Sequence, residues 1–162
     1  MPATPEILFQ KLEELGIKTE THHHDPVFTV EEAQQVSRTL SGGHSKNLFL
    51  KDKKGDIYLL VCLEDTKVDL KELRKKIGAK NLSFGKPDLL MELLGVTPGS
   101  VTPFALINDK DASVKVLLDS EMEKEEFLNF HPLINSQTTQ ISLKDLKLFI
   151  EATGHEVTFV SL

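Results

Sequence analysis

The chain has 162 residues, of which 40% are hydrophobic and 27% charged, the composition of one ordinary globular domain over residues 1–162. No apolar run approaches the roughly 20 residues that span a bilayer, and the first residues lack the basic and apolar segments of a signal peptide, so we expect a cytoplasmic, monomeric protein with no membrane partner. The formal net charge of −6 argues against non-specific binding of nucleic acid.

The first half of the chain predicts two helices, a short strand and a hairpin. Residues 5–15 form an amphipathic helix that starts at Thr4-Pro5 and ends at Gly16. A short strand over 17–23 and a short helix over 30–36 follow. The hairpin joins strands at 47–51 and 57–63 through a polar turn.

The second half predicts three helices and further strands. Asp69 and Glu72 have the spacing of a capping box for a helix over 70–77, and a helix over 87–94 ends at Gly95. A second hairpin is expected from 104–107 and 114–118, followed by a strand at 138–141, a helix from Ser142 to Gly154 and a strand at 157–160. These elements predict an α+β fold, a single domain with a mixed, largely antiparallel β-sheet flanked by helices.

Charge is distributed unevenly along the chain. Between Lys46 and Lys86 there are 11 Lys and Arg residues against six Asp and Glu, whereas the rest has eight against 19. This asymmetry fits an anion-binding face on an acidic body, and it fits equally two solvated helical faces.

Known motifs for metal or nucleophilic chemistry are missing from the sequence. His22-His23-His24 cannot all face one ion in a strand, and no further ligand stands at a useful spacing, so no metal is expected; His24 is the one best placed to line a pocket. There is no nucleophile elbow, zinc-protease pair or dinucleotide fingerprint. Cys62 lies in an apolar run, which favours a core thiol.

Three segments combine permissive backbone with isolated polar side chains: 42–47, 95–103 and 130–135. Glycines in the second would let backbone N–H groups approach a carbonyl or oxyanion, but the segment could equally be a simple connector. His131, held extended by the following proline, could contact a ligand or satisfy a buried backbone group.

Taken together, four stretches resemble the freestanding prolyl-tRNA editing proteins of the YbaK/prolyl-tRNA-synthetase-associated domain superfamily. In chain order they are DPVFTVEEA (25–33), GGHSKNLFLKDKKG (42–55), LSFGKPDLLMELLGVTPGSVTPFALIND (82–109) and NFHPLINSQTT (129–139). The resemblance covers nearly the whole chain.

The resemblance implies a hydrolase that removes alanine from mischarged tRNA(Pro). A synthetase pocket shaped for proline cannot strongly reject a smaller amino acid, because missing methylenes are worth only about 1–3 kcal/mol. In this family water attacks the ester with help from the ribose hydroxyl of the substrate, while the protein positions and polarises. No cofactor is implied. The implied partner is the acceptor end of tRNA(Pro) carrying a small amino acid, with prolyl-tRNA synthetase as a further candidate.

The resemblance also implies roles for single residues. The catalytic residues are Lys46, Gly99 and Ser100, and the substrate-binding residues are Val27, Phe28, Thr29, Asn47, Val101, Thr102 and His131. Lys46 would hold the phosphate of the terminal adenosine, the glycine loop would hold the aminoacyl carbonyl, and His131 would limit the size of the cargo. The basic segment would contact phosphates of the acceptor stem.

Two alternatives stay open. The chain could be a Cys-tRNA(Pro) deacylase of the YbaK type, since pocket volume cannot be read from the sequence. It could also be a non-catalytic module that binds tRNA or the synthetase, although the presence of Lys46, Gly99 and His131 together counts against this.

Overall fold

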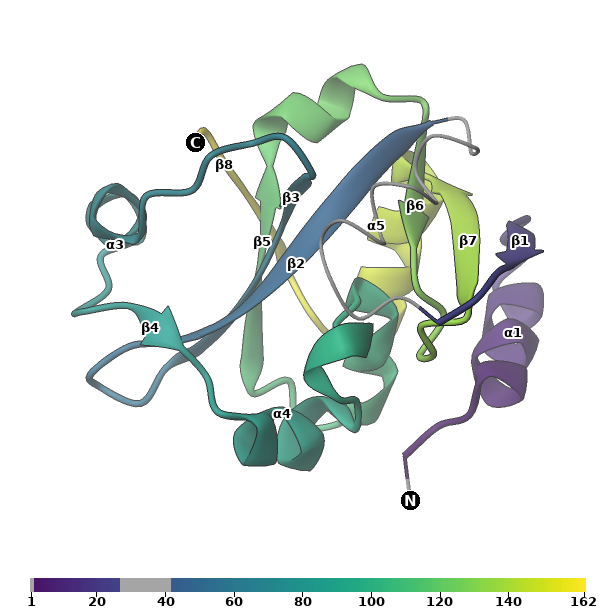
Figure 1. Ribbon diagram of the computed structural model, residues 1–162, viewed down its shortest axis with the longest axis horizontal. Helices are drawn as coiled ribbons and strands as arrows, with labels where there is room; N and C mark the ends of the chain where they lie inside the picture. Colours follow the sequence, from purple (N-terminus) through teal and green to yellow (C-terminus); the bar gives the residue numbers. More distant parts are fainter. Residues whose placement is uncertain (1, 27–41) are drawn as a thin grey trace.

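The computed structural model describes residues 2–26 and 42–162, and its centre is one eight-stranded sheet (Figure 1). The strands are β1 (Glu20–His23), β2 (Gly43–Lys51), β3 (Ile57–Leu63), β4 (Ser83–Phe84), β5 (Val114–Asp119), β6 (Phe127–Phe130), β7 (Gln137–Ser142) and β8 (Val157–Val160). The α-helices are α1 (Pro5–Glu14), α3 (Leu70–Ile77), α4 (Pro87–Leu94) and α5 (Leu143–Ala152), and the 3₁₀ helices are η1 (Pro98–Ser100), η2 (Pro103–Asn108) and η3 (Ser120–Lys124).

Strand β2 is the hub of the sheet. The order is β1-β7-β6-β2-β3-β5-β8, and β4 pairs with β2 beside this path. Four of the seven pairings are antiparallel and three are parallel, the parallel ones being β2 with β6, β3 with β5, and β5 with β8. The expected α+β fold with a mixed sheet is therefore confirmed.

Helix boundaries follow the capping signals in the sequence. Thr4 Oγ1 accepts from the N–H of Ile7 at the start of α1, and the Asp69 carboxylate accepts from two N–H groups at the start of α3. Ser142 Oγ accepts from the N–H of Asp145 at the start of α5. A capped start satisfies N–H groups that have no partner inside the helix, so local sequence is enough to fix these positions. All of these predicted helices are confirmed. The predicted helix over 30–36 lies outside the described residues.

The predicted second hairpin is wrong. Residues 104–107 lie in η2, which starts at Pro103. Thr102 caps this helix, because its Oγ1 accepts from the N–H of Phe104. Strand β5 then pairs in parallel with β3 and β8. A short, wholly apolar run does not distinguish a strand from a buried helical turn, and here the proline and the capping threonine decide for the turn.

Two hydrophobic clusters occupy the two sides of the sheet. The larger one contains Phe104, which packs edge-on against Phe130 and Phe149 with ring centroids 6.0 and 5.5 Å apart, and it is covered by α1, α4, α5 and η2. The smaller one is covered by α3 through the fully buried Leu73. Alternate side chains of β2 therefore contribute to different clusters.

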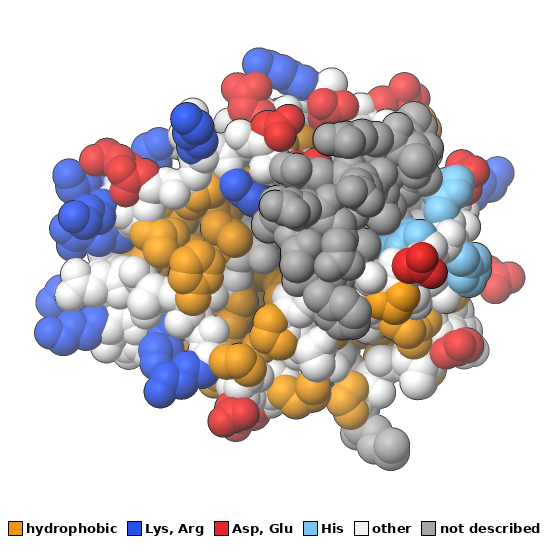
Figure 2. All heavy atoms as spheres, viewed as in Figure 1, with side chains coloured by type: hydrophobic (Ala, Val, Ile, Leu, Met, Phe, Trp, Pro, Cys, Tyr) orange, Lys and Arg blue, Asp and Glu red, His pale blue; other side chains and the backbone are white. Residues whose placement is uncertain are grey.

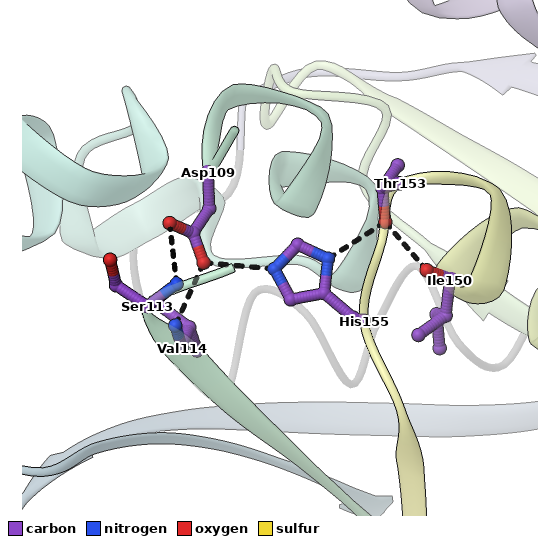
Figure 3. Close-up of polar contacts among 6 residues, drawn as sticks. All are labelled: Asp109, Ser113, Val114, Ile150, Thr153 and His155. Atoms are coloured by element: carbon purple, nitrogen blue, oxygen red, sulfur yellow. Dashed lines mark hydrogen bonds and ion pairs between the residues drawn. The ribbon is translucent and has the colours of Figure 1, made fainter. Parts of the chain in front are cut away.

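A buried polar network joins the end of η2 to the end of α5 (Figure 3). The Asp109 carboxylate accepts from the N–H groups of Ser113 and Val114 and lies 2.8 Å from Nε2 of His155. The other ring nitrogen, Nδ1, lies 2.9 Å from the Thr153 hydroxyl, which itself donates to the carbonyl of Ile150. The Thr153 hydroxyl donates to Ile150 and accepts from Nδ1, so both ring nitrogens of His155 have a partner.

No helix in residues 2–26 and 42–162 is long and apolar enough to cross a membrane.

Candidate active site

Lys46 and Asn47 stand side by side near the middle of β2 and point to opposite faces of the sheet. Asn47 is paired with Val61, which belongs to the larger cluster, whereas Lys46 is paired with Cys62 on the other face. Lys46 is half-buried, and no carboxylate in the described part of the chain forms an ion pair with it. Its ammonium group is therefore a cation without a protein counter-ion there.

The thiol next to Lys46 does not act as a nucleophile. Cys62 is fully buried, which confirms the expected core thiol. Burial raises its pKa to about 11, although the nearby Lys46 acts in the opposite direction. The group is a neutral thiol at physiological pH, and a neutral thiol is a poor nucleophile.

The glycine loop over 99–102 is tied to β2 by one side chain. Nδ2 of Asn47 donates to the carbonyl of Val101 at 3.1 Å, and Oδ1 of Asn47 is buried without a partner in the described chain. Within the described residues, the N–H group of Val101 donates to no acceptor. The loop thus leaves a backbone donor unused while its carbonyl is fixed, as a site that binds a carbonyl or oxyanion requires.

The residues on either side of Val101 differ in how far they are buried. Ser100 is buried, with 7% of its surface exposed, and Gly99 is half-buried. Thr102 is fully buried and its hydroxyl caps η2. The resemblance implies that Thr102 contacts the substrate, whereas its buried position is that of a residue that supports the loop.

A histidine pair lies where β1, β6 and β7 meet. His24 Nδ1 donates to the carbonyl of Asp25, and its Nε2 lies 2.7 Å from the Thr138 hydroxyl. His131 Nδ1 donates to the carbonyl of Gln137 at 2.9 Å, which leaves Nε2 of its neutral ring as an acceptor. The two rings are 6.2 Å apart. Figure 2 shows histidine side chains grouped along one border of this face.

The three segments singled out in the sequence meet at β2. The first forms β2 itself, and the second reaches it through the bond from Asn47 to Val101. The third follows β6, which pairs in parallel with β2 through Gly43 opposite Leu128 and His44 opposite Asn129. Lys46 comes two positions after His44 and His131 two positions after Asn129, so the parallel register carries both segments in the same direction from this pair.

The close approach of β2 and β6 depends on a glycine. A Cβ atom at Gly43 would lie 2.9 Å from Cγ of Glu125 and 3.1 Å from a methyl group of Leu128. A larger residue would therefore push apart the two strands that carry Lys46 and lead to His131.

Val27, Phe28 and Thr29 lie outside the described residues. Within residues 2–26 and 42–162, no three His, Cys, Asp or Glu side chains converge as a metal site would need. Among residues that were not predicted, Thr138 and Gln137 contact the histidine pair, and no local pattern in the sequence singles them out.

Burial lowers the pKa of His131 below its ordinary value, and the charge of His24 acts in the same direction while the bond to Gln137 opposes it. A histidine whose folded pKa is depressed contributes stability that is present above pH 6.5 and lost as the pH falls through the folded pKa. One proton gives a slope of at most about 1.4 kcal/mol per pH unit. We expect urea unfolding between pH 7.5 and 5 to show a shallower loss of stability in His131→Gln than in the wild type. Equal slopes would contradict this environment for His131.

Comparison with known proteins places these features in a family. The family described as "Aminoacyl-tRNA editing domain" matches residues 24–149. The "Prolyl-tRNA editing protein ProX" of Acetoanaerobium sticklandii is 39% identical over 153 residues, which cover 94% of this chain and 93% of that protein. The "Prolyl-tRNA synthetase associated domain-containing protein 1" of Mus musculus is 42% identical and is matched over 92% of this chain and 90% of its own.

Solved structures agree on the fold. A crystal structure described as a proposed trans-editing enzyme for prolyl tRNA synthetase superposes with a TM-score of 0.73. The superposition covers 100% of this chain and 99% of the other at 20% identity. The fold is thus retained where most of the sequence has changed.

Proposed function

The chain belongs to the aminoacyl-tRNA editing domain family, and from this we propose that it hydrolyses the ester of tRNA(Pro) mischarged with a small amino acid, alanine above all. The observation that carries the proposal is the meeting of three segments at β2. A lysine without an ion pair in the described chain lies on β2, a glycine loop is bonded to the next residue of β2, and a neutral histidine follows the strand that pairs with the start of β2. The protein acts as a cytoplasmic monomer whose partner is the acceptor end of tRNA(Pro).

The reaction needs no covalent intermediate with the protein. A water oxygen attacks the aminoacyl carbonyl carbon, and the free ribose hydroxyl of the terminal adenosine relays the proton of that water to the departing ribose oxygen. The ester C–O bond then breaks, releasing the amino acid and a tRNA with both hydroxyls free. Aminoacyl esters are already activated, so positioning and oxyanion stabilisation supply the remaining rate.

Each residue has a limited task in this scheme. Lys46 holds the phosphate of the terminal adenosine as a compact point charge. Gly99 and Val101 place backbone N–H groups at the developing oxyanion. The N–H of Ser100 donates to the carbonyl of Thr97 at 2.9 Å, so Ser100 shapes the loop, and Asn47 fixes the loop by its bond to Val101.

The cargo is selected by the walls of the pocket. His131 forms one wall, and because its imidazole is neutral it contacts the amino acid without adding a positive charge beside the α-ammonium group. The family resemblance assigns the opposite wall to Val27, Phe28 and Thr29, which lie outside the described residues. A pocket that admits alanine and excludes the larger proline acts as the second of two sieves.

A deacylation panel tests the specificity. Ala-, Cys-, Ser- and Pro-tRNA(Pro) are incubated separately with the purified chain, and the remaining ester is measured over time. We expect Ala-tRNA(Pro) to be cleaved fastest and Pro-tRNA(Pro) to decay at the rate seen in buffer. Faster cleavage of Cys-tRNA(Pro) would assign the chain to the cysteine-specific branch instead. Equal cleavage of Ala-tRNA(Pro) and Pro-tRNA(Pro) would show that the pocket does not exclude proline.

A further inference from the structure

One aromatic side chain is held open to solvent on the short edge strand β4. Phe84 is 63% exposed, the highest value among large hydrophobic residues in the described chain. It is paired with Leu50 of β2, and the next residue, Gly85, donates its N–H to the carbonyl of Phe49 at 2.9 Å. A Cβ atom at Gly85 would lie 2.4 Å from the Phe49 ring. The backbone that carries Phe84 is therefore fixed against β2.

Phe84 lies on the face of the sheet that carries Lys46. Lys46, Leu48 and Leu50 occupy alternate positions of β2, and Phe84 stands opposite Leu50 in an antiparallel pair, where opposite residues share a face. Four residues of strand separate Lys46 from this pair, a distance of roughly 13 Å. A chain bound at Lys46 can thus reach Phe84 by running along β2.

Lysines flank this aromatic residue without protein counter-ions. Lys86 follows it by two positions, and the N–H of Lys53 donates to the carbonyl of Lys80 close to the same edge. None of these three lysines forms an ion pair with a described residue. Figure 2 shows hydrophobic side chains over the region of α3, β4 and β2 with Lys and Arg side chains around them.

Aspartates stand close in sequence to these lysines but are fewer: residues 50–56 and 80–88 together hold five lysines and three aspartates. Asp52 accepts from the backbone N–H groups of Lys54 and Asp56, and Asp56 pairs with Lys115 at 3.5 Å. Asp88, in the first turn of α4, is the exposed carboxylate closest in sequence to Phe84. The surroundings of Phe84 are basic on a chain whose net charge is −6.

We propose that Phe84 is a stacking platform for an unpaired base of the tRNA 3′ tail, upstream of the terminal adenosine, and that Lys53, Lys80 and Lys86 contact the adjacent phosphates. The inference rests on the proposed function, because Lys46 is taken to hold the terminal nucleotide on the same face. An exposed aromatic ring with lysines around it is the usual arrangement for binding single-stranded nucleic acid, since every base presents a π-face. A purely apolar protein partner would not require the lysines.

The test measures the binding of two uncharged RNAs by fluorescence anisotropy. One is an acceptor-stem minihelix with its unpaired 3′ tail, and the other is the same stem without the tail. Stacking on an aromatic side chain corresponds to a change of about 5- to 150-fold in Kd. We expect Phe84→Ala to weaken binding of the tailed RNA by this factor and to leave the blunt stem within twofold, while Phe84→Trp retains the wild-type affinity.

The matched control is Leu148→Ala, which removes another exposed hydrophobic side chain from α5 on the opposite side of the sheet. It should bind both RNAs like the wild type. Unchanged binding of the tailed RNA by Phe84→Ala, or equal losses for both RNAs, would overturn the stacking role. This result is distinct from a failure of the proposed function, which would appear as absent deacylation by the wild-type protein.

Discussion

Lys46→Ala is expected to lower kcat/KM for deacylation of Ala-tRNA(Pro) by about 10- to 150-fold, the loss that corresponds to one charged hydrogen bond of about 1.5–3 kcal/mol. The physical reason is that the ammonium group has no ion-pair partner in the described chain, so its charge is free for the phosphate of the terminal adenosine. For the same reason removal of the side chain breaks no ion pair. The melting temperature should therefore change little.

Two variants control this experiment. Lys46→Arg keeps the charge but replaces a point charge by a planar fork, and it should retain an intermediate activity. Lys144→Ala removes an exposed lysine from α5 and should leave kcat/KM unchanged. Unfolding of Lys46→Ala would instead assign that lysine a structural role, and full activity would remove it from the mechanism.

His155→Ala is expected to lower the free energy of unfolding by about 3–5 kcal/mol, because it leaves the Asp109 carboxylate buried without its partner. Both side chains are nearly inaccessible, with 1% and 3% of their surfaces exposed, so water cannot replace the lost bond. At this chain length the change corresponds to a fall of about 6–20 °C in melting temperature. Urea denaturation with a two-state fit measures it directly.

A double-mutant cycle tests whether the two residues act as a unit. Asp109→Asn keeps the shape of the side chain and removes its charge, and it should be destabilising alone. Combined with His155→Gln, it should cost less than the sum of the single variants, since no uncompensated charge remains buried. Strict additivity would show that the pair in Figure 3 is not coupled.

Local signals predicted most of the fold. The starts of α1, α3 and α5 were correct because a side chain at each cap satisfies neighbouring N–H groups, a pattern confined to a few residues. Strands β3 and β8 were correct because apolar runs between turn residues bound them. The segment 104–107 was wrong because its apolar character is shared by strands and buried turns.

Contacts between distant segments could not be predicted in the same way. The parallel pairing of β2 with β6 joins residues about 85 positions apart, and the bond from Asn47 to Val101 spans 54 positions. No local pattern encodes such contacts. The candidate site was therefore identified through the resemblance of whole segments, and the structure supplied the reason why these segments meet.

The buried pair of Asp109 and His155 was missed altogether. Asp109 stands between the two strands of the predicted second hairpin and His155 between the last predicted helix and strand, and nothing in the spacing links them. The partners of a polar side chain in a turn cannot be predicted from the sequence when one of them, here His155, comes from a distant segment.

The most direct test of the account is a single-turnover measurement with the purified chain in excess over Ala-tRNA(Pro), followed by the release of alanine. The account predicts release well above the rate in buffer and a loss of most of that release in Lys46→Ala. Release no faster than in buffer, by a folded protein that still binds the tRNA, would contradict it and identify the chain as a binding module.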